Sequence, residues 1–261
     1  ALVAAKMLIP VAHVEAGLRS FDRTMPEEIN RTLTDHISDL LFTTEESGNE
    51  NLLREGVSEE KIFFVGDVMI DTLLRHREAA RALNMPERFG LSPKGYAVLT
   101  LHRPSNVDRR EVLSGIVEAL SQVQNLLPIA FPVHPRTKKR LEEFGLWEEL
   151  SRLPNMVLTE PLGYLEFLGL MQDARVVLTD SGGIQEETTI LKVPCLTLRY
   201  NTERPITLTQ GTNRLVGNKP EDIVRAVREI LSRGIRVGRL PDLWDGRAAE
   251  RIVRILRKRL N

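Results

Sequence analysis

The sequence is poor in the features that mark secreted, membrane-spanning and nucleic-acid-binding proteins. It has one cysteine, Cys195, in 261 residues, so an internal disulfide is excluded and a reducing compartment is expected. Its 36 basic and 36 acidic residues cancel, which leaves no overall field to recruit nucleic acid or an anionic membrane. Lys6 and His13 interrupt the apolar run over residues 1–14, so no segment is suited to crossing a bilayer. We expect a cytoplasmic globular protein without nucleic-acid or membrane partners.

Signatures of the common cofactor sites are also missing. Neither His102 nor His134 has metal-ligand spacing with another histidine, cysteine or acid. The absence of G-x-G-x-x-G gives no support to an oxidation that uses NAD. Cys195 lies in an apolar segment and is interpreted as a small core residue. No metal and no cofactor are therefore expected.

Apolar runs of strand length alternate with segments of helical periodicity, which predicts an α/β fold. About three strands are expected in residues 1–84, followed by a linker over 85–95, where two prolines and two glycines interrupt the pattern. The alternation resumes over 96–240, and a basic amphipathic helix within 241–261 should close the fold on the protein surface, because it lacks aromatic membrane anchors. The chain opens at what reads as a helix end, so we expect the first domain to be incomplete.

A glycine-containing turn after residues 176–179 is the strongest local indication of a ligand site. This apolar run predicts a strand, and it is followed in order by Asp180, Ser181, Gly182 and Gly183 and then by a helical pattern. Glycines let a ligand approach the backbone, and the N–H groups that open a helix suit a phosphate. A turn that binds nothing would show the same pattern, so the assignment depends on other motifs.

Glu15 stands where an α/β fold usually places its chemistry. Residues 8–14 predict a buried strand, and Glu15 follows at its carboxyl end, where open parallel sheets bind ligands. A loop carboxylate paired with Arg19 would explain the same residues. The pattern alone does not separate the two interpretations.

A helix is expected over residues 26–42, with two acids in its first turn. Its apolar face is formed by Ile29, Leu33, Ile37 and Leu40. The acids could serve only to favour the positive end of the helix dipole. Helical spacing nevertheless places Glu27 on the flank of the apolar face and Glu28 on the far side, so Glu27 is the better candidate to face a site.

Two histidines follow expected strands, and each has an arginine one or two residues further on: His102 with Arg103, and His134 with Arg136. A single histidine at a strand end is usually a hydrogen-bonded loop residue. Two such pairs favour anion binding. Phe167, in a short expected helix, is interpreted from its own surroundings as a core residue.

Six motifs together resemble those of the non-hydrolysing UDP-N-acetylglucosamine 2-epimerases. They are HVEAGLRS at 13–20, PEEINR at 26–31, LHRP at 101–104, PVHP at 132–135, TDSGGIQEE at 179–187 and TERP at 202–205. The resemblance implies two Rossmann-like domains of the glycosyltransferase-B type, here 1–84 and 96–240, with a nucleotide sugar between them and a homodimer as the usual assembly. Nothing in the chain matches the family's first strand-helix units.

The resemblance also implies roles for particular residues. Glu15 and Glu27 would be acid/base carboxylates, and His102 would meet the diphosphate as UDP leaves. The implied UDP-binding residues are Arg103, Phe167 at the uracil, Ser181, Gly182 and Gly183 at the phosphate, Glu187 at the ribose, and Arg204. Arg103 and His134 match residues of a second site where a UDP-sugar activates bacterial members. Leu162 stands where the family often has glutamine, at a contact with uracil.

The implied reaction interconverts UDP-N-acetylglucosamine and UDP-N-acetylmannosamine by elimination and re-addition of UDP through a 2-acetamidoglucal. An epimerase of a UDP-diacetamido-uronic acid is one alternative. A non-catalytic UDP-sugar-binding fragment and a glycosyltransferase of the same fold are the others. A glycosyltransferase would need an acceptor groove but would not need the pair of Glu15 and Glu27.

Overall fold

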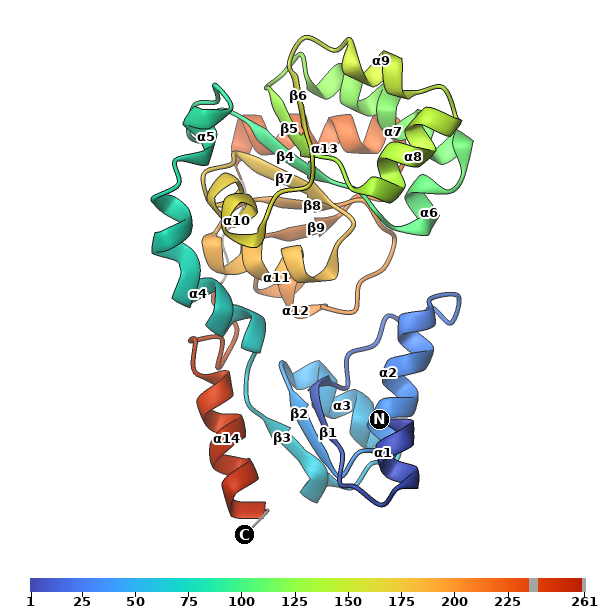
Figure 1. Ribbon diagram of the computed structural model, residues 1–261, viewed down its shortest axis with the longest axis vertical. Coiled ribbons are helices and arrows are strands. Elements are labelled where there is room, and N and C mark those ends of the chain that lie inside the picture. Colours follow the sequence, from blue (N-terminus) through green and yellow to red (C-terminus); the bar gives the residue numbers. More distant parts are fainter. Residues whose placement is uncertain (235–238, 260–261) are drawn as a thin grey trace. The chain divides into compact units, whose positions relative to one another are not determined.

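The computed structural model describes residues 1–234 and 239–259 of the chain and is drawn in Figure 1. It divides into two compact units, which consist of residues 1–75, 202–209 and 239–261 (unit 1) and residues 76–201 and 210–238 (unit 2). The division falls ten residues before the linker predicted over 85–95, and that segment contains a short helix, α5 (Met85–Arg88). Residues 235–238 and 260–261 of the predicted C-terminal segments lie outside the described residues.

Unit 2 contains a six-stranded parallel sheet with the strand order β6-β5-β4-β7-β8-β9. The strands are β4 (Ala97–Thr100), β5 (Ile129–Pro132), β6 (Met156–Thr159), β7 (Val176–Thr179), β8 (Cys195–Thr197) and β9 (Asn213–Leu215). Renumbered along the chain, this order is 3-2-1-4-5-6, that of the doubly wound dinucleotide-binding folds. Strands in such a sheet are covered on both faces, which explains their almost unbroken apolar sequences.

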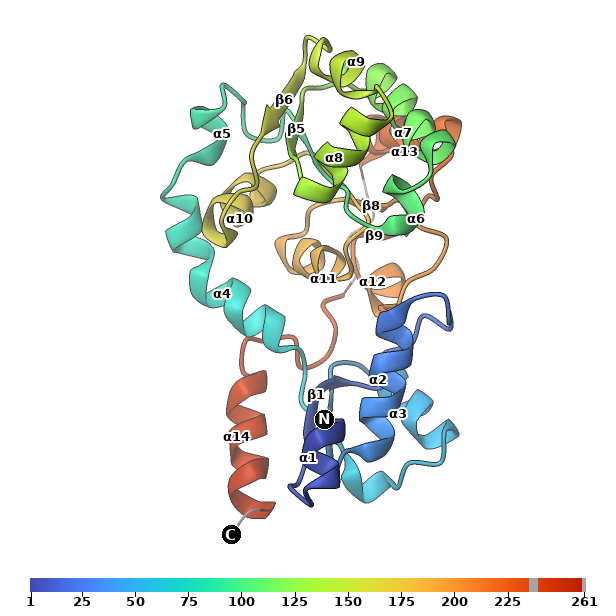
Figure 2. The ribbon, with the colours of Figure 1, turned by 45° about the vertical axis from the view of Figure 1, so that its right-hand side comes forward.

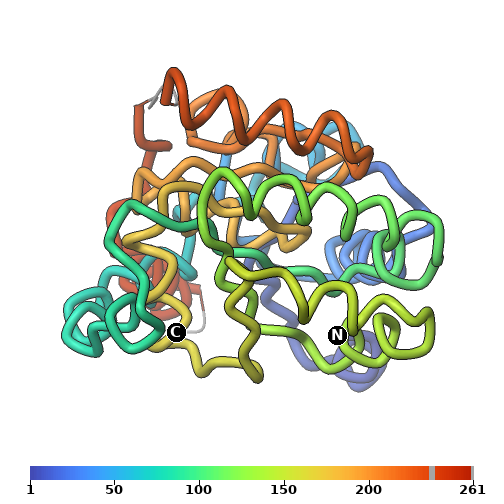
Figure 3. The backbone as a smooth tube through the Cα atoms, turned by 90° about the horizontal axis from the view of Figure 1, so that it is seen from above, coloured from blue at the N-terminus to red at the C-terminus, as the bar shows by residue number. Residues whose placement is uncertain are grey.

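Helices cover the unit 2 sheet and complete its core. They are α6 (Pro104–Val107), α7 (Arg110–Val123), α8 (Pro135–Glu143), α9 (Trp147–Ser151), α10 (Tyr164–Gln172), α11 (Gly182–Leu191) and α13 (Pro220–Arg233). Helices α7 and α13 pack side by side, as Figures 1 and 3 show. Their apolar faces, which include Leu113, Ile116 and Val227, join the apolar core around the unit 2 sheet.

Unit 1 contains a three-stranded parallel sheet in the order β1-β2-β3. Its strands are β1 (Ala12–Ala16), β2 (Leu40–Thr43) and β3 (Ile62–Phe64), and its helices are α1 (Leu2–Lys6), α2 (Pro26–Ile37), α3 (Glu46–Arg54), the 3₁₀ turn η1 (Glu59–Lys61), α12 (Ile206–Thr209) and α14 (Ala248–Arg259). Helix α4 (Val68–Arg81) begins in unit 1 and ends in unit 2. Figure 2 shows α1 beside α2, which it contacts.

Helix α2 is shorter and differently oriented than its sequence predicts. It ends at Ile37 rather than at residue 42, because the chain turns extended at Ser38 and Leu40 begins β2. Ile29 and Leu33, on the expected apolar face, are 43% and 61% exposed, whereas the buried residues of the helix are two acids. Those acids bind the polar loop after β1, and this polar packing replaces the apolar contact that periodicity indicates.

The last described helix, α14, packs on unit 1. Ile252 of this helix lies in a small apolar cluster with Phe42 and Val65. Trp244, which precedes the helix, donates its indole N–H to the Thr44 carbonyl at 2.9 Å. None of the helices in residues 1–234 and 239–259 has both the length and the apolar character that a membrane crossing requires. Cys195 is fully buried in β8, as predicted for a core residue.

Candidate functional site

The strand order of unit 2 places a candidate site between β4 and β7. The order reverses there, because β4 is followed by β5 on one side and β7 by β8 on the other. Ligands of open α/β sheets bind at such a switch point, beyond the carboxyl ends of the strands. The two strands end level, with Thr100 opposite Thr179 and their hydroxyl oxygens 2.7 Å apart. Asp180 follows Thr179 directly and His102 stands two residues after Thr100, so residues far apart in the sequence meet at one point.

Asp180 is fully buried, and its carboxylate organises the loop after β4. Oδ1 lies 2.8 Å from His102 Nδ1, while Oδ2 accepts the Arg103 backbone N–H at 2.9 Å and the Asn106 side-chain N–H at 3.2 Å. Burial alone would raise the pKa of Asp180, but the hydrogen bond and charge of His102 and the Arg103 N–H hold it below its ordinary value. Asp180 is therefore an ionised acceptor for Nδ1, and His102 keeps Nε2 as the nitrogen that can meet a ligand.

A cavity of about 310 Å³ lies within unit 2 beside this pair. Its lining includes His102, His134, Leu162, Phe167 and Ser181. The ring centroids of the two histidines are 5.8 Å apart. Four residues that the sequence analysis singled out for binding therefore line one cavity. Phe167, which looked like a core residue by itself, contributes to this wall.

The amino end of α11 opens at the same cavity. Ser181 is its N-cap in extended conformation, and Gly182 and Gly183 are its first two residues. Within the described part of the chain no side chain caps this end, and the Ser181 backbone N–H donates to Thr179 Oγ1 at 3.0 Å. The glycines are helical rather than left-handed, so their backbone angles do not require glycine. Free first-turn amides and the helix dipole make this end suited to an anion.

Glu187, one turn into α11, is buried and bonded to a tyrosine. The Tyr164 hydroxyl, at the start of α10, donates to Glu187 Oε1 at 3.0 Å. Burial and the charge of Glu187 raise the pKa of Tyr164, so its proton stays on and the bond keeps this direction. Tyr164 was not singled out as a site residue, and a tyrosine three residues before Phe167 on one helix face was the signal available.

In unit 1, Glu15 adopts a left-handed backbone conformation inside β1. Its φ is 65°, at the point where the pairing with β2 shifts register between Val14 and Ala16. Non-glycine residues rarely adopt such a conformation, which costs about 1–3 kcal/mol and occurs often at functional sites. Its carboxylate Oε2 lies 3.3 Å from Arg204 Nη2. Glu15 is thus held out of the regular pleat and beside a buried arginine.

The alternative pairing of Glu15 with Arg19 is wrong. Arg19 binds two other acids, with contacts of 2.7 Å to Asp35 Oδ2 and 2.7 Å to Glu55 Oε2. Asp35 also lies 2.5 Å from His13 Nδ1. Burial would lower the pKa of Arg19, but the hydrogen bonds to Glu55 and Asp35 raise it overall, so this buried guanidinium stays charged. The network holds the loop that follows Glu15.

The two acids that open α2 have opposite environments. Glu28 is buried and accepts the Ser20 N–H at 3.0 Å, the Ser20 hydroxyl at 2.9 Å and the Phe21 N–H at 2.9 Å. Glu27 is exposed. Glu28 therefore has the structural task of holding the loop, and Glu27 remains available to a ligand.

The predicted site residues fall into the two units. Glu15, Glu27 and Arg204 belong to unit 1, while His102, Arg103, His134, Phe167, Ser181, Gly182, Gly183 and Glu187 belong to unit 2. Among the described residues, no group of three or more histidine, cysteine, aspartate or glutamate side chains is arranged to hold a metal ion. Residues without an individual assignment from sequence, Asp180 and Asn106, prove central to the geometry around His102.

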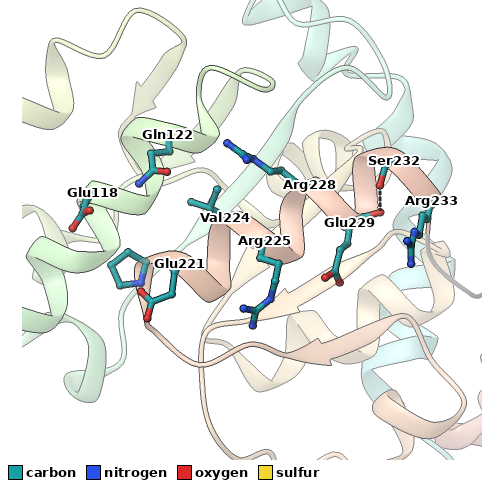
Figure 4. Close-up of a pocket in the computed structure, with 10 residues that line it drawn as sticks. Glu118, Gln122, Glu221, Val224, Arg225, Arg228, Glu229, Ser232 and Arg233 are labelled. Carbon is teal, nitrogen blue, oxygen red and sulfur yellow. Dashed lines mark hydrogen bonds between the residues drawn. The ribbon is translucent and has the colours of Figure 1, made fainter.

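A larger hollow, of about 660 Å³, lies elsewhere in unit 2 and holds none of the predicted residues. Figure 4 shows Glu118 and Gln122 of α7 on one side and the charged side chains of α13 on the other. The lining mixes acids and arginines, and the hydrogen bond drawn in Figure 4 lies within helix α13, from the Ser232 hydroxyl to the Glu229 carbonyl at 3.2 Å. Mixed charge without convergent donors does not indicate a site, so the cavity at His102 is the better candidate.

Known proteins resemble this chain over nearly its whole length. The family model described as UDP-N-acetylglucosamine 2-epimerase matches residues 1–257. The UDP-N-acetylglucosamine 2-epimerase of Methanocaldococcus jannaschii is 51% identical over 261 residues, which cover 98% of this chain and 71% of that protein. Its crystal structure in complex with UDP-GlcNAc and UDP has a TM-score of 0.92, with the same 98% and 71% coverage.

A second relative differs in substrate. The UDP-2,3-diacetamido-2,3-dideoxy-D-glucuronate 2-epimerase of Pseudomonas aeruginosa is 42% identical over 263 residues, which cover 99% of this chain and 71% of that protein. The chain thus spans about 71% of the length of each of these proteins. Together with the two parallel sheets, the likeness to solved structures confirms the predicted α/β fold of the glycosyltransferase-B type.

Proposed function

This chain belongs to the UDP-N-acetylglucosamine 2-epimerase family, and from that premise we propose that it interconverts UDP-N-acetylglucosamine and UDP-N-acetylmannosamine. The observation that carries the proposal is the contact of His102 with the buried Asp180 carboxylate, 2.8 Å apart, at the switch point of a doubly wound sheet and beside an uncapped helix end. A diphosphate needs positive charge and amide donors, and both meet here. No cofactor is required by the chemistry.

The reaction requires UDP to leave before the proton at C2 of the sugar is removed. C2 has no neighbouring carbonyl, so direct deprotonation would give a poorly stabilised carbanion. As the C1–O bond breaks, oxocarbenium character at C1 acidifies the C2 proton, and a carboxylate takes it to give the 2-acetamidoglucal. Re-addition of UDP with protonation of the opposite face of C2 inverts that centre. Two acid/base groups on different faces are needed.

Glu15 and Glu27 are our candidates for these carboxylates. Glu15 is supported by its left-handed backbone, a strained conformation that is frequent at functional sites, and by its ion pair with Arg204. Glu27 is supported by its exposure next to Glu28, whose hydrogen bonds are used by the loop. His102, held through Nδ1, would offer Nε2 to the departing diphosphate.

The remaining candidates would hold the nucleotide. Ser181, Gly182 and Gly183 would bind phosphate through the open end of α11, Glu187 would accept from the ribose hydroxyls, and Phe167 would lie against uracil. Arg103, whose Nε donates to the Asp180 carbonyl at 3.3 Å, and Arg204 would add charge. Leu162 lines the same cavity. Because leucine has no polar side-chain atom, a hydrogen bond to uracil at this position would have to come from the backbone. If the family's contact uses the side chain instead, base recognition is weaker here.

The experiment is proton NMR of UDP-N-acetylglucosamine incubated with the chain in D₂O. Exchange at C2 together with the appearance of the manno isomer is expected from the elimination mechanism. Saturable UDP binding without exchange would reject epimerisation by this chain and favour the binding-only alternative. His102→Gln should slow both exchange and epimer formation, because both follow loss of UDP.

An epimerase of a UDP-diacetamido-uronic acid is the second candidate, and the 42% identity to the Pseudomonas aeruginosa enzyme favours it. The two substrates differ at C3 and C6, so a direct competition decides between them. A higher kcat/KM for the uronic acid would replace our first proposal.

We further propose a homodimer in the cytoplasm and activation by a second UDP-sugar at Arg103 and His134. The 5.8 Å approach of the His134 and His102 rings supports a neighbouring subsite in one cavity. His134→Ala should convert a sigmoidal dependence of rate on substrate into a hyperbolic one. A wild-type curve that is already hyperbolic would contradict the activator, and a monomeric mass in solution would contradict the dimer.

A further inference from the structure

We propose that Asn106 and Asn218 are positioning residues that, together with Tyr200, lock Asp180 and thereby the ring of His102. The assignment of His102 to the diphosphate rests on the proposed function. The hydrogen-bond chain itself does not, because all of its members belong to unit 2 and every link is defined by distance.

The chain of bonds runs from the surface to the buried carboxylate. The Tyr200 hydroxyl donates to Asn218 Oδ1 at 2.8 Å, and Asn218 Nδ2 donates to Asn106 Oδ1 at 3.2 Å. Asn106 Nδ2 then donates to Asp180 Oδ2 at 3.2 Å. The other oxygen of Asp180 faces His102 Nδ1. The histidine is therefore the last member of a series that begins at a side chain exposed by 67%.

Chemistry fixes the direction of every donor in this series. Asp180 accepts the backbone N–H of Arg103 and lies against His102, which keeps it ionised and able only to accept. Asn106 must consequently present its amino group to Asp180 and its carbonyl to Asn218. Asn218 must then donate to Asn106 and accept from Tyr200. A single orientation of each amide satisfies all the bonds. Neither Asn106 nor Asn218 can therefore exchange its amide oxygen and nitrogen without losing hydrogen bonds.

Asn106 is the most deeply buried amide of the series and makes more than one hydrogen bond. It is 1% exposed, and its amino group also donates to the Leu198 carbonyl at 2.9 Å, at the end of β8. It thereby fixes the carboxylate of Asp180 relative to the strand on the far side of the switch point. A buried hydrogen bond to a charged group contributes about twice as much as one between neutral groups.

The outer end depends on a glycine. Gly217 has a φ of +68°, and a Cβ there would lie 2.4 Å from Cε1 of Tyr200. A side chain there would displace the ring, and the ring position sets where its hydroxyl meets Asn218.

The competing explanation is that Asn106 merely fastens α6 to β8. Loss of stability would follow from either explanation, so stability does not discriminate. Two readouts do. A positioning role changes the tautomer and ring environment of His102, and it lowers kcat while the KM for the nucleotide sugar stays within about twofold, because the series touches no substrate.

The experiment compares Asn106→Asp, Asn218→Ala and Tyr200→Phe with the matched control Asn125→Ala. Asn106→Asp keeps the shape but replaces the neutral amide donor with a second carboxyl, which must either repel Asp180 or share a proton with it. The exposed amide of Asn125, in contrast, donates to a nearby group, the Ser121 carbonyl, at 3.0 Å. In ¹⁵N-histidine-labelled protein without ligand, the His102 signals are identified by their disappearance in His102→Gln. Five histidines make this assignment practical.

We expect kcat to fall by about tenfold to a hundredfold in Asn106→Asp, by about threefold to tenfold in Asn218→Ala and by less in Tyr200→Phe. The His102 Nδ1 and Nε2 shifts should change in the same order, and the control should match the wild type. Unchanged His102 shifts in Asn106→Asp or, if that variant does not fold, in Asn218→Ala would overturn the proposal. The chemical shifts are measured without substrate. An inactive wild type would therefore count against the proposed reaction and not against the hydrogen-bond series.

Discussion

Glu15 and Arg204, which are 189 residues apart in the sequence, form an ion pair in unit 1 with 3.3 Å between Oε2 and Nη2. The arginine is 8% exposed, so its charge acts on the carboxylate with little screening by water. The ion pair holds the carboxylate in one orientation, as proton transfer to or from a defined face requires. The pairing gives a physical reason to assign Glu15 to proton transfer.

We predict that Glu15→Gln lowers turnover by about 10²–10⁴-fold, the range for loss of a general acid/base. The affinity for UDP should be unchanged, because the amide keeps the size of the side chain. NMR of C2 exchange in D₂O and calorimetric titration with UDP measure the two quantities. Glu50→Gln, at an exposed position of α3, is the control. Loss of UDP binding in Glu15→Gln would sink the acid/base role.

The neighbours Glu27 and Glu28 should separate function from stability. Glu28→Gln removes the charge from three hydrogen bonds to Ser20 and Phe21, so we expect about 1.5–3 kcal/mol less free energy of unfolding. Glu27→Gln should change stability by less than about 0.5 kcal/mol, since the side chain is exposed, and yet lower turnover. Urea unfolding and the epimerisation assay on both variants test this. Full activity in Glu27→Gln would remove it from the mechanism.

The local parts of the site could be predicted from sequence because they depend on short-range patterns. Strand β7, the turn at Ser181 and helix α11 occupy the positions that apolar runs, glycines and helical spacing indicate. The binding position at the carboxyl end of the strands follows from the rules of parallel sheets. The resemblance of the motifs then suggested roles that spacing alone left open, and these roles stay predictions.

Long-range polar pairs could not be predicted in the same way. Asp180 meets His102 only because β4 and β7 are neighbours in the sheet. Arg19 forms ion pairs with Asp35 and Glu55 and not with Glu15. Periodicity also failed for α2, where the buried face contains Glu28 rather than Leu33. Hydropathy patterns assume that burial is apolar, and a buried carboxylate with several donors violates that assumption.

Glu45 should make stability depend on pH. It is 1% exposed at the start of α3, and burial raises its pKa to about 7, although the Ser47 hydroxyl and the charge of Arg204 oppose the shift. The folded state therefore holds a proton that the unfolded chain releases near the ordinary glutamate pKa of 4.5. This contribution to stability is fully present below about pH 4.5 and is lost as pH rises through about 7, in total about 3 kcal/mol.

We predict that Glu45→Gln abolishes this dependence. The free energy of unfolding of the variant relative to the wild type should rise between about pH 5 and about pH 8, because the amide never has to ionise. Denaturant titrations at both pH values give the difference, and Glu46→Gln, at an exposed neighbour, supplies the background. An equal difference at both pH values would show that Glu45 is ionised in the folded protein throughout.

The turn after Glu15 gives a prediction about geometry. Gly17 has a φ of +78°, and a Cβ there would lie 2.3 Å from the carbonyl oxygen of Gly48 at the start of α3. Backbone atoms cannot move aside as a flexible side chain can. Gly17→Ala must therefore shift the loop that orients Glu15, in addition to the strain of a left-handed alanine.

Gly56→Ala is the matched control, because Gly56 has a φ of +83° and nothing within 4 Å of the added Cβ. We expect Gly56→Ala to cost about 1–2 kcal/mol, the strain alone. Gly17→Ala should cost at least twice as much and should also lower turnover, whereas the control should remain active. Urea unfolding and C2 exchange measure both effects. Equal destabilisation by the two variants would mean that the Gly48 contact relaxes at no cost, and that Glu15 does not depend on it.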